Sequence, residues 1–116
     1  MTAAASALPF ACAPDLNAAL EDWRRWLAQE KRSSHHTCRA YHADVAAFLT
    51  FLSGHFGQSV ALNDLSAARL ADFRSWMSRQ TIDGRAAASR ARALSGVKNF
   101  LKWMDREGRL HNAAVE

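Results

Sequence analysis

The 116-residue sequence is poor in glycine, proline and cysteine, and it has no long hydrophobic run. Its five glycines and two prolines are too few for a collagen-like chain or a low-complexity linker. Its content of 49% hydrophobic residues is too high for a disordered tail. Because no stretch of about 18 uncharged apolar residues occurs, we expect no membrane-spanning segment. The length fits a single domain with a real core.

Signals for secretion are also missing. Residues 1–14 lack the Lys/Arg-rich start of a secretory signal, and we expect them to form a flexible leader. Two cysteines, Cys12 and Cys38, are too few for a disulfide framework. Both features favour a cytoplasmic protein.

Residues that favour β-strands are scarce, since valine occurs four times and isoleucine once. Apolar residues instead recur three or four positions apart, which is the pattern of one helix face. The pattern predicts an all-α fold in which four helices close into a compact bundle. We expect these helices over residues 15–31, 35–53, 67–79 and 85–106.

Capping residues set the expected ends of these helices. Asp15, Ser34 and Ser66 are expected to cap the first three helices at their N-termini. Gly54 is expected to end the second helix, and Gly108 to end the fourth. The tail at 110–116 is expected to have no partner in this bundle.

Positive charge is concentrated in one segment. Residues 1–83 carry eight Lys/Arg and eight Asp/Glu, whereas residues 84–109 carry seven Lys/Arg and two Asp/Glu. A local basic stripe is a better indicator of nucleic-acid binding than the net charge of +4. A solvated helix face would have the same composition, so charge alone leaves both interpretations open.

Motifs for catalysis are missing from the sequence. It contains no phosphate-binding glycine loop, no His-Glu-x-x-His zinc motif and no nucleophile elbow. Cys38 and His42 are four residues apart and could hold a metal, but the position of Cys38 on the apolar face favours a core cysteine. Tyr41 lies on the same face and is expected to pack there. We expect no catalytic residue, metal, cofactor or small-molecule substrate.

Two surfaces are candidates for binding double-stranded DNA. The first is the start of the second helix, where free N–H groups, hydroxyls and cations suit phosphate, although an ordinary solvated helix start is the alternative. The second is the side of the fourth helix opposite its expected core stripe of Leu94, Val97, Leu101 and Met104. Small residues among arginines on that side would let the helix approach DNA closely. The candidate DNA-binding residues are Arg32, Ser34, His36, Thr37, Arg39, Arg85, Ser89, Arg90, Arg92, Gly96, Lys98 and Asn99.

The order of the motifs resembles a known family. The pattern S-x-x-T-x-x-A-Y-x-x-D-V over residues 34–45 is similar to the second-helix signature of tyrosine recombinases, and residues 84–103 are similar to their fourth helix. The whole span of residues 16–108 resembles the N-terminal core-binding domain of Xer-type recombinases and phage integrases. One departure is Gly-Arg-Ala at residues 84–86, where the family often has Gly-Leu-Ser.

The resemblance implies a SAM-like four-helix domain that grips the recombination core site with its second and fourth helices. It implies a core-binding domain over residues 15–109 and the start of a linker at 110–116. In the family, a catalytic domain follows and cuts and rejoins DNA strands through a phosphotyrosyl intermediate. The sequence lacks that domain, so we expect it to be a non-enzymatic part of a longer recombinase. Other recombinase protomers are then further expected partners.

Two alternatives remain open beside this interpretation. The chain could be a helical protein-interaction module whose basic fourth helix binds an acidic partner. It could also be a stand-alone helical DNA-binding regulator. Titration with heparin and with duplex DNA at two salt concentrations would separate the first alternative from DNA binding.

Overall fold

Helices dominate the computed structural model, which describes residues 12–29 and 34–115. Over these residues the structure has no strand, only an isolated bridge between Cys12 and Val60. The prediction of an all-α fold is confirmed. In chain order the elements are α2 (Pro14–Gln29), α3 (His35–Phe56), α4 (Leu62–Ala67), α5 (Leu70–Ile82), α6 (Ala87–Arg106) and the 3-10 turn η1 (Ala113–Val115).

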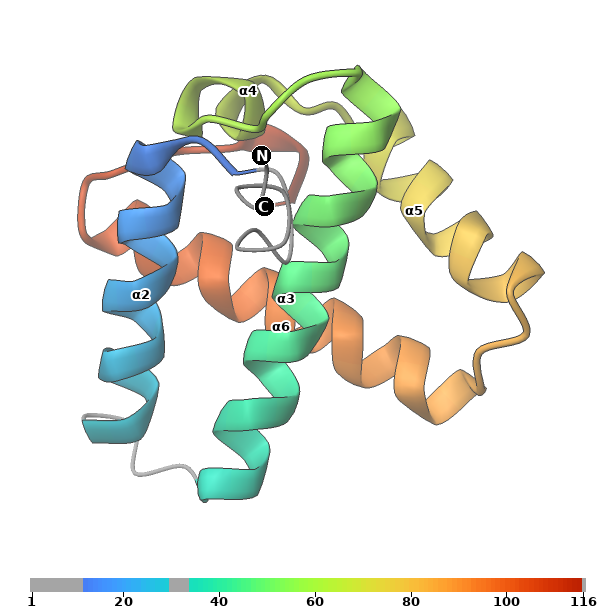
Figure 1. The fold of residues 1–116 in the computed structure, drawn as a ribbon, viewed down its shortest axis with the longest axis horizontal. Helices are drawn as coiled ribbons and strands as arrows, with labels where there is room; N and C mark the ends of the chain where they lie inside the picture. The colour runs from blue at the N-terminus through green and yellow to red at the C-terminus, as the bar shows by residue number, and fades with distance from the viewer. Residues whose placement is uncertain (1–11, 30–33, 116) are drawn as a thin grey trace, which may run out of the picture.

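The two longest helices cross and organise the rest. Helices α2 and α3 lie side by side, and α6 passes behind them, with α5 on the far side of α3 and α4 at one end (Figure 1). The most extensive contact between helices joins α3 to α6. No helix within the described ranges is both long enough and apolar enough to cross a membrane.

Buried aromatic residues join these helices. Trp23 of α2 packs on Phe100 of α6 with ring centroids 4.9 Å apart, and Phe48 of α3 packs edge-on against Trp76 of α5 at 4.8 Å. All four side chains are at most 3% exposed. Aromatic side chains bury more apolar area than other residues, so these pairs fix how α2 and α5 sit on the α3–α6 crossing.

The ends of the first two helices differ in part from prediction. Ser34 caps α3 as expected, since its Oγ accepts the Thr37 N–H at 3.0 Å. Helix α2 begins at Pro14, so the prediction of Asp15 as its N-cap is wrong. Gly54 does not end α3, which continues to Phe56 before Gly57 adopts a left-handed φ of 74°. Phe56 packs against the core, and this contact stabilises the last residues of α3.

A short helix, α4, occupies part of the segment that was expected to be a connection. Ser66 lies inside α4, so its predicted role as the cap of the third helix is wrong, and α5 begins at Leu70 instead. Acidic residues one turn inside each helix do the capping. Asp64 Oδ2 accepts the Ala61 N–H at 2.9 Å, and Asp72 Oδ2 accepts the Arg69 N–H at 2.8 Å.

The tail after α6 is packed against the bundle. Gly108 ends the α6 region with a positive φ of 72°, as expected. Leu110 and Asn112 are then buried, and Asn112 Nδ2 donates to the carbonyls of Leu65 at 2.8 Å and Ala68 at 2.9 Å. The expectation of a tail without a partner is therefore wrong, because a buried side-chain amide closes the end of α4.

Part of the expected leader lies outside the described residues, namely 1–11. The backbone immediately after them is engaged with the bundle. The Ala13 N–H donates to the Val60 carbonyl at 2.9 Å.

Candidate nucleic-acid interface

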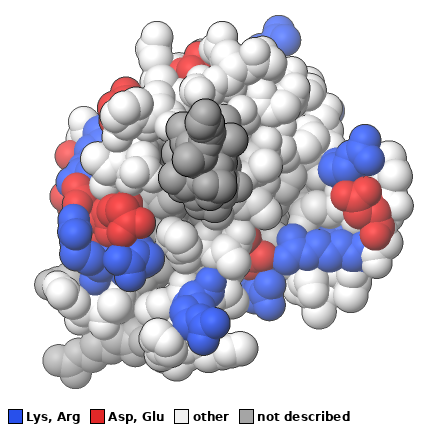
Figure 2. Space-filling view, in the orientation of Figure 1, with Lys and Arg blue, Asp and Glu red and all other residues white. Residues whose placement is uncertain are grey.

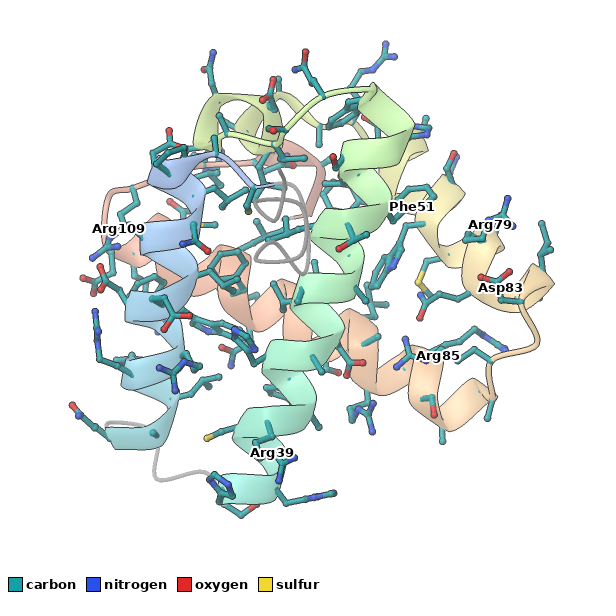
Figure 3. The ribbon with its side chains drawn as sticks, viewed as in Figure 1. Arg39, Phe51, Arg79, Asp83, Arg85 and Arg109 are labelled. Atoms are coloured by element: carbon teal, nitrogen blue, oxygen red, sulfur yellow. The ribbon has the colours of Figure 1, made fainter. Side chains whose placement is uncertain are left out.

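The start of α3 is an exposed helix end whose hydroxyls are engaged in the cap. Ser34 Oγ accepts the Thr37 N–H and donates to Thr37 Oγ1 at 2.9 Å. His36 and Arg39 are exposed, and Figure 3 shows Arg39 near this end of the helix. Arg39 is therefore the strongest donor presented by the described part of this end. Arg32 lies outside the described residues.

A buried carboxylate organises the other candidate surface. Asp44 of α3 is 3% exposed. Its Oδ1 accepts from Arg85 Nη2 at 2.6 Å and from Arg92 Nη2 at 3.2 Å, and its Oδ2 accepts from Arg92 Nε at 2.8 Å. Gln80 holds Arg85 from the other side, with Oε1 2.6 Å from Nη1. One side chain thus ties both arginines to α3, Arg85 from the segment before α6 and Arg92 from within α6.

The electrostatics of this cluster leave an excess positive charge. One carboxylate balances only one of the two guanidinium groups, and their side chains are 30% and 45% exposed for Arg85 and Arg92 respectively. Hydrogen bonding and charge attraction from Asp44 hold the pKa of Arg92 above its usual value. Nη1 of Arg92 has no acceptor within residues 12–29 and 34–115. The cluster can therefore donate to a further anion.

The expected outward placement of Gly96 and Asn99 is wrong. Gly96 is buried against α3, where a Cβ built on it would lie 3.4 Å from Tyr41 Cδ1. Asn99 is half-buried, and its Oδ1 accepts the Trp23 indole N–H at 2.9 Å. Gly96 therefore lies at the contact between two helices of this chain, where a Cβ would still make ordinary van der Waals contact, and Asn99 serves contact with α2.

The solvent side of α6 is turned by roughly a quarter of a turn from the expected one. Phe100 and Trp103 are at most 3% exposed, whereas Leu94 is only half-buried. A helix orients its largest apolar side chains inward, so Phe100 and Trp103 outweigh Leu94 in setting its rotation. The exposed residues along this side are Ala88, Ala91, Arg92, Ser95, Lys98, Lys102, Asp105 and Arg106. Ser95 and Lys102 were not among the candidates, although the two aromatic residues could have indicated them.

The remaining α6 candidates differ in how far they reach solvent. Ser89 and Arg90 are half-buried, and Arg90 Nη1 donates to the Arg85 carbonyl at 2.6 Å. Arg90 therefore braces the turn into α6. Lys98 is exposed. Over the face drawn in Figure 2, Lys and Arg gather in the middle and lower parts, while the upper part over α4 shows few.

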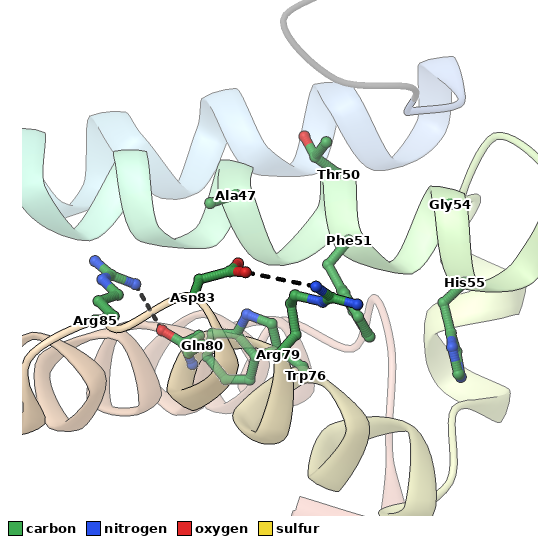
Figure 4. A pocket seen from close by; sticks show the side chains of 10 residues that line it. All are labelled: Ala47, Thr50, Phe51, Gly54, His55, Trp76, Arg79, Gln80, Asp83 and Arg85. Atoms are coloured by element: carbon green, nitrogen blue, oxygen red, sulfur yellow. Dashed lines mark hydrogen bonds and ion pairs between the residues drawn. The ribbon is translucent and has the colours of Figure 1, made fainter.

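A hollow between α3 and α5 adjoins the arginine cluster. Its volume is about 550 Å³, and Arg85 lies at one end of it (Figure 4). Inside it Arg79 pairs with Asp83 at 3.5 Å, while Gln80 holds Arg85. Arg79 and Asp83 thus balance each other, and Gln80 makes the hollow part of the support for Arg85.

Residues weighed for chemistry are placed as packing groups. Cys38 is 7% exposed, and Tyr41 packs against the core. Burial and nearby Asp15 raise the pKa of the Cys12 thiol to about 12, which makes it a poor nucleophile. The described residues contain no group of three side chains suited to a metal ion.

In a comparison with known proteins, most of the chain matches a single family model. Residues 20–108 match the family model described as phage integrase, N-terminal SAM-like domain. The chain is 49% identical over 115 residues to tyrosine recombinase XerC of Rhodospirillum centenum, covering 99% of this chain and 34% of that protein. It is 41% identical to tyrosine recombinase XerC of Mesorhizobium japonicum over 101 residues, covering 87% of this chain and 32% of that protein. The chain thus spans about a third of the length of these curated relatives. No solved structure matches it.

Proposed function

Because the chain belongs to the phage integrase N-terminal SAM-like domain family, as a XerC-like tyrosine recombinase N-terminal domain, we propose that it binds double-stranded DNA. The contacts come from the start of α3 and from the solvent side of α6. They are mainly contacts to phosphate, which position a protein on DNA without reading its sequence. The proposed contact residues are Ser34, His36, Thr37, Arg39, Arg85, Ser89, Arg90, Arg92, Ser95, Lys98 and Lys102.

The proposal for the longer protein rests on the relatives' being tyrosine recombinases and on what the family resemblance of the sequence implies. A catalytic segment beyond this domain would cut and rejoin DNA strands through a phosphotyrosyl intermediate, together with other recombinase protomers. Residues 15–109 would form the DNA-binding domain, and residues 110–116 would lead toward that segment. The role of this chain is to grip the DNA, without a cofactor of its own.

The arginine pair on Asp44 is the observation that carries the proposal. A buried carboxylate is costly unless it is paired, and here it is paired with two cations, Arg92 of α6 and Arg85 of the segment before it. The arrangement fixes α6 against α3 and leaves one positive charge facing solvent between them. A phosphate oxyanion is the ligand that a partly exposed guanidinium with spare N–H donors suits best.

Salt dependence gives the proposal a quantitative form. Arg39, Lys98 and Lys102 have no ion pair within the described residues, and the Arg85–Asp44–Arg92 cluster adds one net positive charge. Each phosphate that is neutralised contributes about 0.9 to the slope of log affinity against log salt. For these four charges we expect a slope of about −4. If all seven basic residues at 84–109 neutralised a phosphate, the slope would instead be about −6.

Fluorescence anisotropy of a labelled mixed-sequence duplex, titrated at several salt concentrations, tests this surface. Lys102→Gln removes an exposed, unpaired cation and is expected to weaken binding and to reduce the slope by about one. Arg92→Gln is expected to weaken binding as well, with Gln able to retain one hydrogen bond to Asp44. Arg69→Gln is the matched control, because Arg69 is exposed beside the opposite end of α3.

The outcomes separate the candidate functions. Weaker binding by Lys102→Gln and Arg92→Gln, with Arg69→Gln unchanged, would support DNA binding through α6. Equal binding by all four proteins would contradict it. Binding to heparin without binding to duplex DNA at low salt would instead favour an acidic protein partner.

A further inference from the structure

Gln80 of α5 is a buried polar residue that contacts the arginine cluster at Asp44. It is 6% exposed, and its Oε1 accepts a hydrogen bond from Arg85 Nη1 at 2.6 Å. Figure 4 shows the two side chains pointing toward each other at one end of the hollow between α3 and α5. A guanidinium has no acceptor, so the atom that faces it must be the amide oxygen. Burying an amide is costly unless it is hydrogen-bonded, and Arg85 supplies that bond.

Arg85 is held by its backbone as well as by its side chain. The Arg85 N–H donates to the Gln80 carbonyl at 3.0 Å, and Arg90 Nη1 donates to the Arg85 carbonyl at 2.6 Å. Asp44 accepts from the other terminal nitrogen of Arg85, Nη2, at 2.6 Å. Contacts from α3, α5 and α6 therefore fix the orientation of the guanidinium, while the Arg85 side chain stays 30% exposed.

The oriented guanidinium of Arg85 keeps donors for a ligand. It carries five N–H groups, of which Asp44 and Gln80 each accept one. The other three have no acceptor among residues 12–29 and 34–115. Donors that are already oriented bind an anion more tightly than mobile ones, because less side-chain freedom is lost on binding.

The amide at position 80 also determines the net charge of the cluster. Two arginines face one carboxylate, so Asp44, Arg85 and Arg92 together carry one net positive charge. A glutamate at position 80 would accept the same hydrogen bond from Arg85, and its charge would make that bond stronger. It would also bring the charge of the cluster to zero. The neutral amide therefore orients Arg85 without balancing it.

We propose that Gln80 is a positioning residue of the DNA interface, which orients Arg85 for a backbone phosphate and leaves the charge of the cluster available to that phosphate. This role rests on the proposed function, since Arg85 is one of its contact residues. It adds α5 to the elements on which DNA binding depends, although Gln80 itself does not touch the DNA. Position 80 acts on binding in two separable ways, through its hydrogen bond and through its lack of charge.

Fluorescence anisotropy of a labelled duplex at several salt concentrations separates these two effects. Gln80→Glu neutralises the cluster, so the slope of log affinity against log salt should change from about −4 to about −3, and affinity at about 0.1 M salt should fall about eightfold. Gln80→Met removes the acceptor but adds no charge. Its slope should stay near about −4, and its affinity should fall roughly threefold at every salt concentration.

Asn63→Asp is the matched control for the added negative charge. Asn63 is exposed on α4, which lies away from Arg85 (Figures 1 and 3). This variant should bind the duplex with the slope of the unaltered chain. Thermal unfolding of each variant checks that it is folded at the temperature of the assay.

A double-mutant cycle shows whether Gln80 acts through Arg85. In an Arg85→Gln background, Gln80→Met should have no further effect on affinity, because the donor that it orients is gone. A purely structural role of Gln80 would weaken binding equally in both backgrounds. If Gln80→Glu does not fold, this cycle decides the question by itself.

The outcomes distinguish this role from the proposed function. An unchanged slope for Gln80→Glu, or an equal effect of Gln80→Met with and without Arg85, would overturn the role of Gln80. Duplex binding that still depends on Lys102 would then leave the proposed function standing. Absence of duplex binding by the unaltered chain at low salt would overturn both.

Discussion

Asp44 is the residue whose substitution tests the architecture most sharply. Asp44→Asn keeps the size of the side chain but removes the charge that Arg85 and Arg92 share. The carboxylate is 3% exposed and accepts three hydrogen bonds of 2.6, 2.8 and 3.2 Å. Asparagine retains one oxygen acceptor and points N–H groups at a guanidinium, so at least one charge-assisted bond is lost.

The size of the expected loss in unfolding free energy depends on how far Asp44 and its two arginine partners are buried. Hydrogen bonds to charged groups contribute about 1.5–3 kcal/mol each. Removing one partner of a fully buried ion pair costs about 3–5 kcal/mol. The Arg85 and Arg92 side chains are 30% and 45% exposed, so they regain water when Asp44 is neutralised. We therefore expect a loss of about 2–3 kcal/mol in the free energy of unfolding, which lowers Tm by about 10 °C in a domain of this size.

Urea unfolding followed by tryptophan fluorescence measures this loss. The four tryptophans report on the core, and an unchanged m value would show that the unfolded state is not altered. Asp105→Asn is the matched control. Its side chain is 53% exposed and pairs with His111 on the surface, so a change within about 0.5 kcal/mol is expected.

Two results would refute the reasoning about Asp44. One is a loss for Asp44→Asn no larger than that of Asp105→Asn. The other comes from a double-mutant cycle with Arg85→Met. If Asp44→Asn costs the same whether or not Arg85 is present, the two residues are not coupled and the charge pair does not explain the stability.

Three further predictions concern packing and acid stability. Gly96→Ala should stabilise the chain by about 0.5–1 kcal/mol, since its Cβ would make ordinary contact with Tyr41 at 3.4 Å in a helix interior, whereas Gly96→Leu should destabilise it by more than about 1 kcal/mol in urea unfolding. Asn112→Ala should cost about 1–3 kcal/mol in the same assay, because the buried amide no longer donates to the carbonyl of Ala68, the residue after α4, or to that of Leu65, which keeps only the Ala68 N–H. The Arg69 N–H, and after it His55, lowers the pKa of Asp72 below its usual 3.8, so its contribution to stability is present above about pH 4 and is lost as pH falls further. The stability of Asp72→Asn should therefore fall less steeply than that of the unaltered chain over the acid range.

Helical periodicity was sufficient to predict the long helices but not α4. Helices α2, α3, α5 and α6 each repeat an apolar face over several turns, whereas α4 has six residues and less than two turns. Its start also lacks a Ser or Thr cap, because Asp64 accepts the Ala61 N–H and the distant Asp15 accepts the Leu62 N–H at 3.4 Å. Asn112 closes the other end from 44 residues away or more, and no local pattern can predict such a contact.

The candidate site was predicted in its elements but not in its orientation. Ser34 and Arg39 lie on the exposed start of α3, as the sequence indicated. Gly96 was expected to face a ligand and instead faces Tyr41, because the choice of Leu94 as a core residue displaced the expected face. Asp44 was missed although it lies among the apolar residues of α3. A carboxylate in that position requires a cationic partner, and this requirement is a signal that the sequence contained.

The orientation of α6 determines which basic residues of segment 84–109 make contacts within the fold and which remain exposed. Arg85 and Arg92 bind Asp44, Arg90 binds a backbone carbonyl, and Arg109 lies over a tryptophan ring and pairs with Asp22. Most of the arginines thus hold the fold together, although all of them count toward the basic stripe. Arginine suits this use because its planar group forms several directed hydrogen bonds while its stem packs on apolar surface.

The two lysines of α6, unlike the arginines, make no contact that holds the fold together. Lys98 and Lys102 stand exposed on its solvent side without an ion pair among the described residues. A lysine on a flexible stem contacts phosphate as a point charge and needs no fixed geometry. The segment therefore divides its charge by residue type, with arginines setting the position of α6 and lysines left exposed for the proposed contact with DNA. The excess exposed charge at the Asp44 cluster is where these two roles meet, since Arg92 both holds α3 and keeps a donor for an anion.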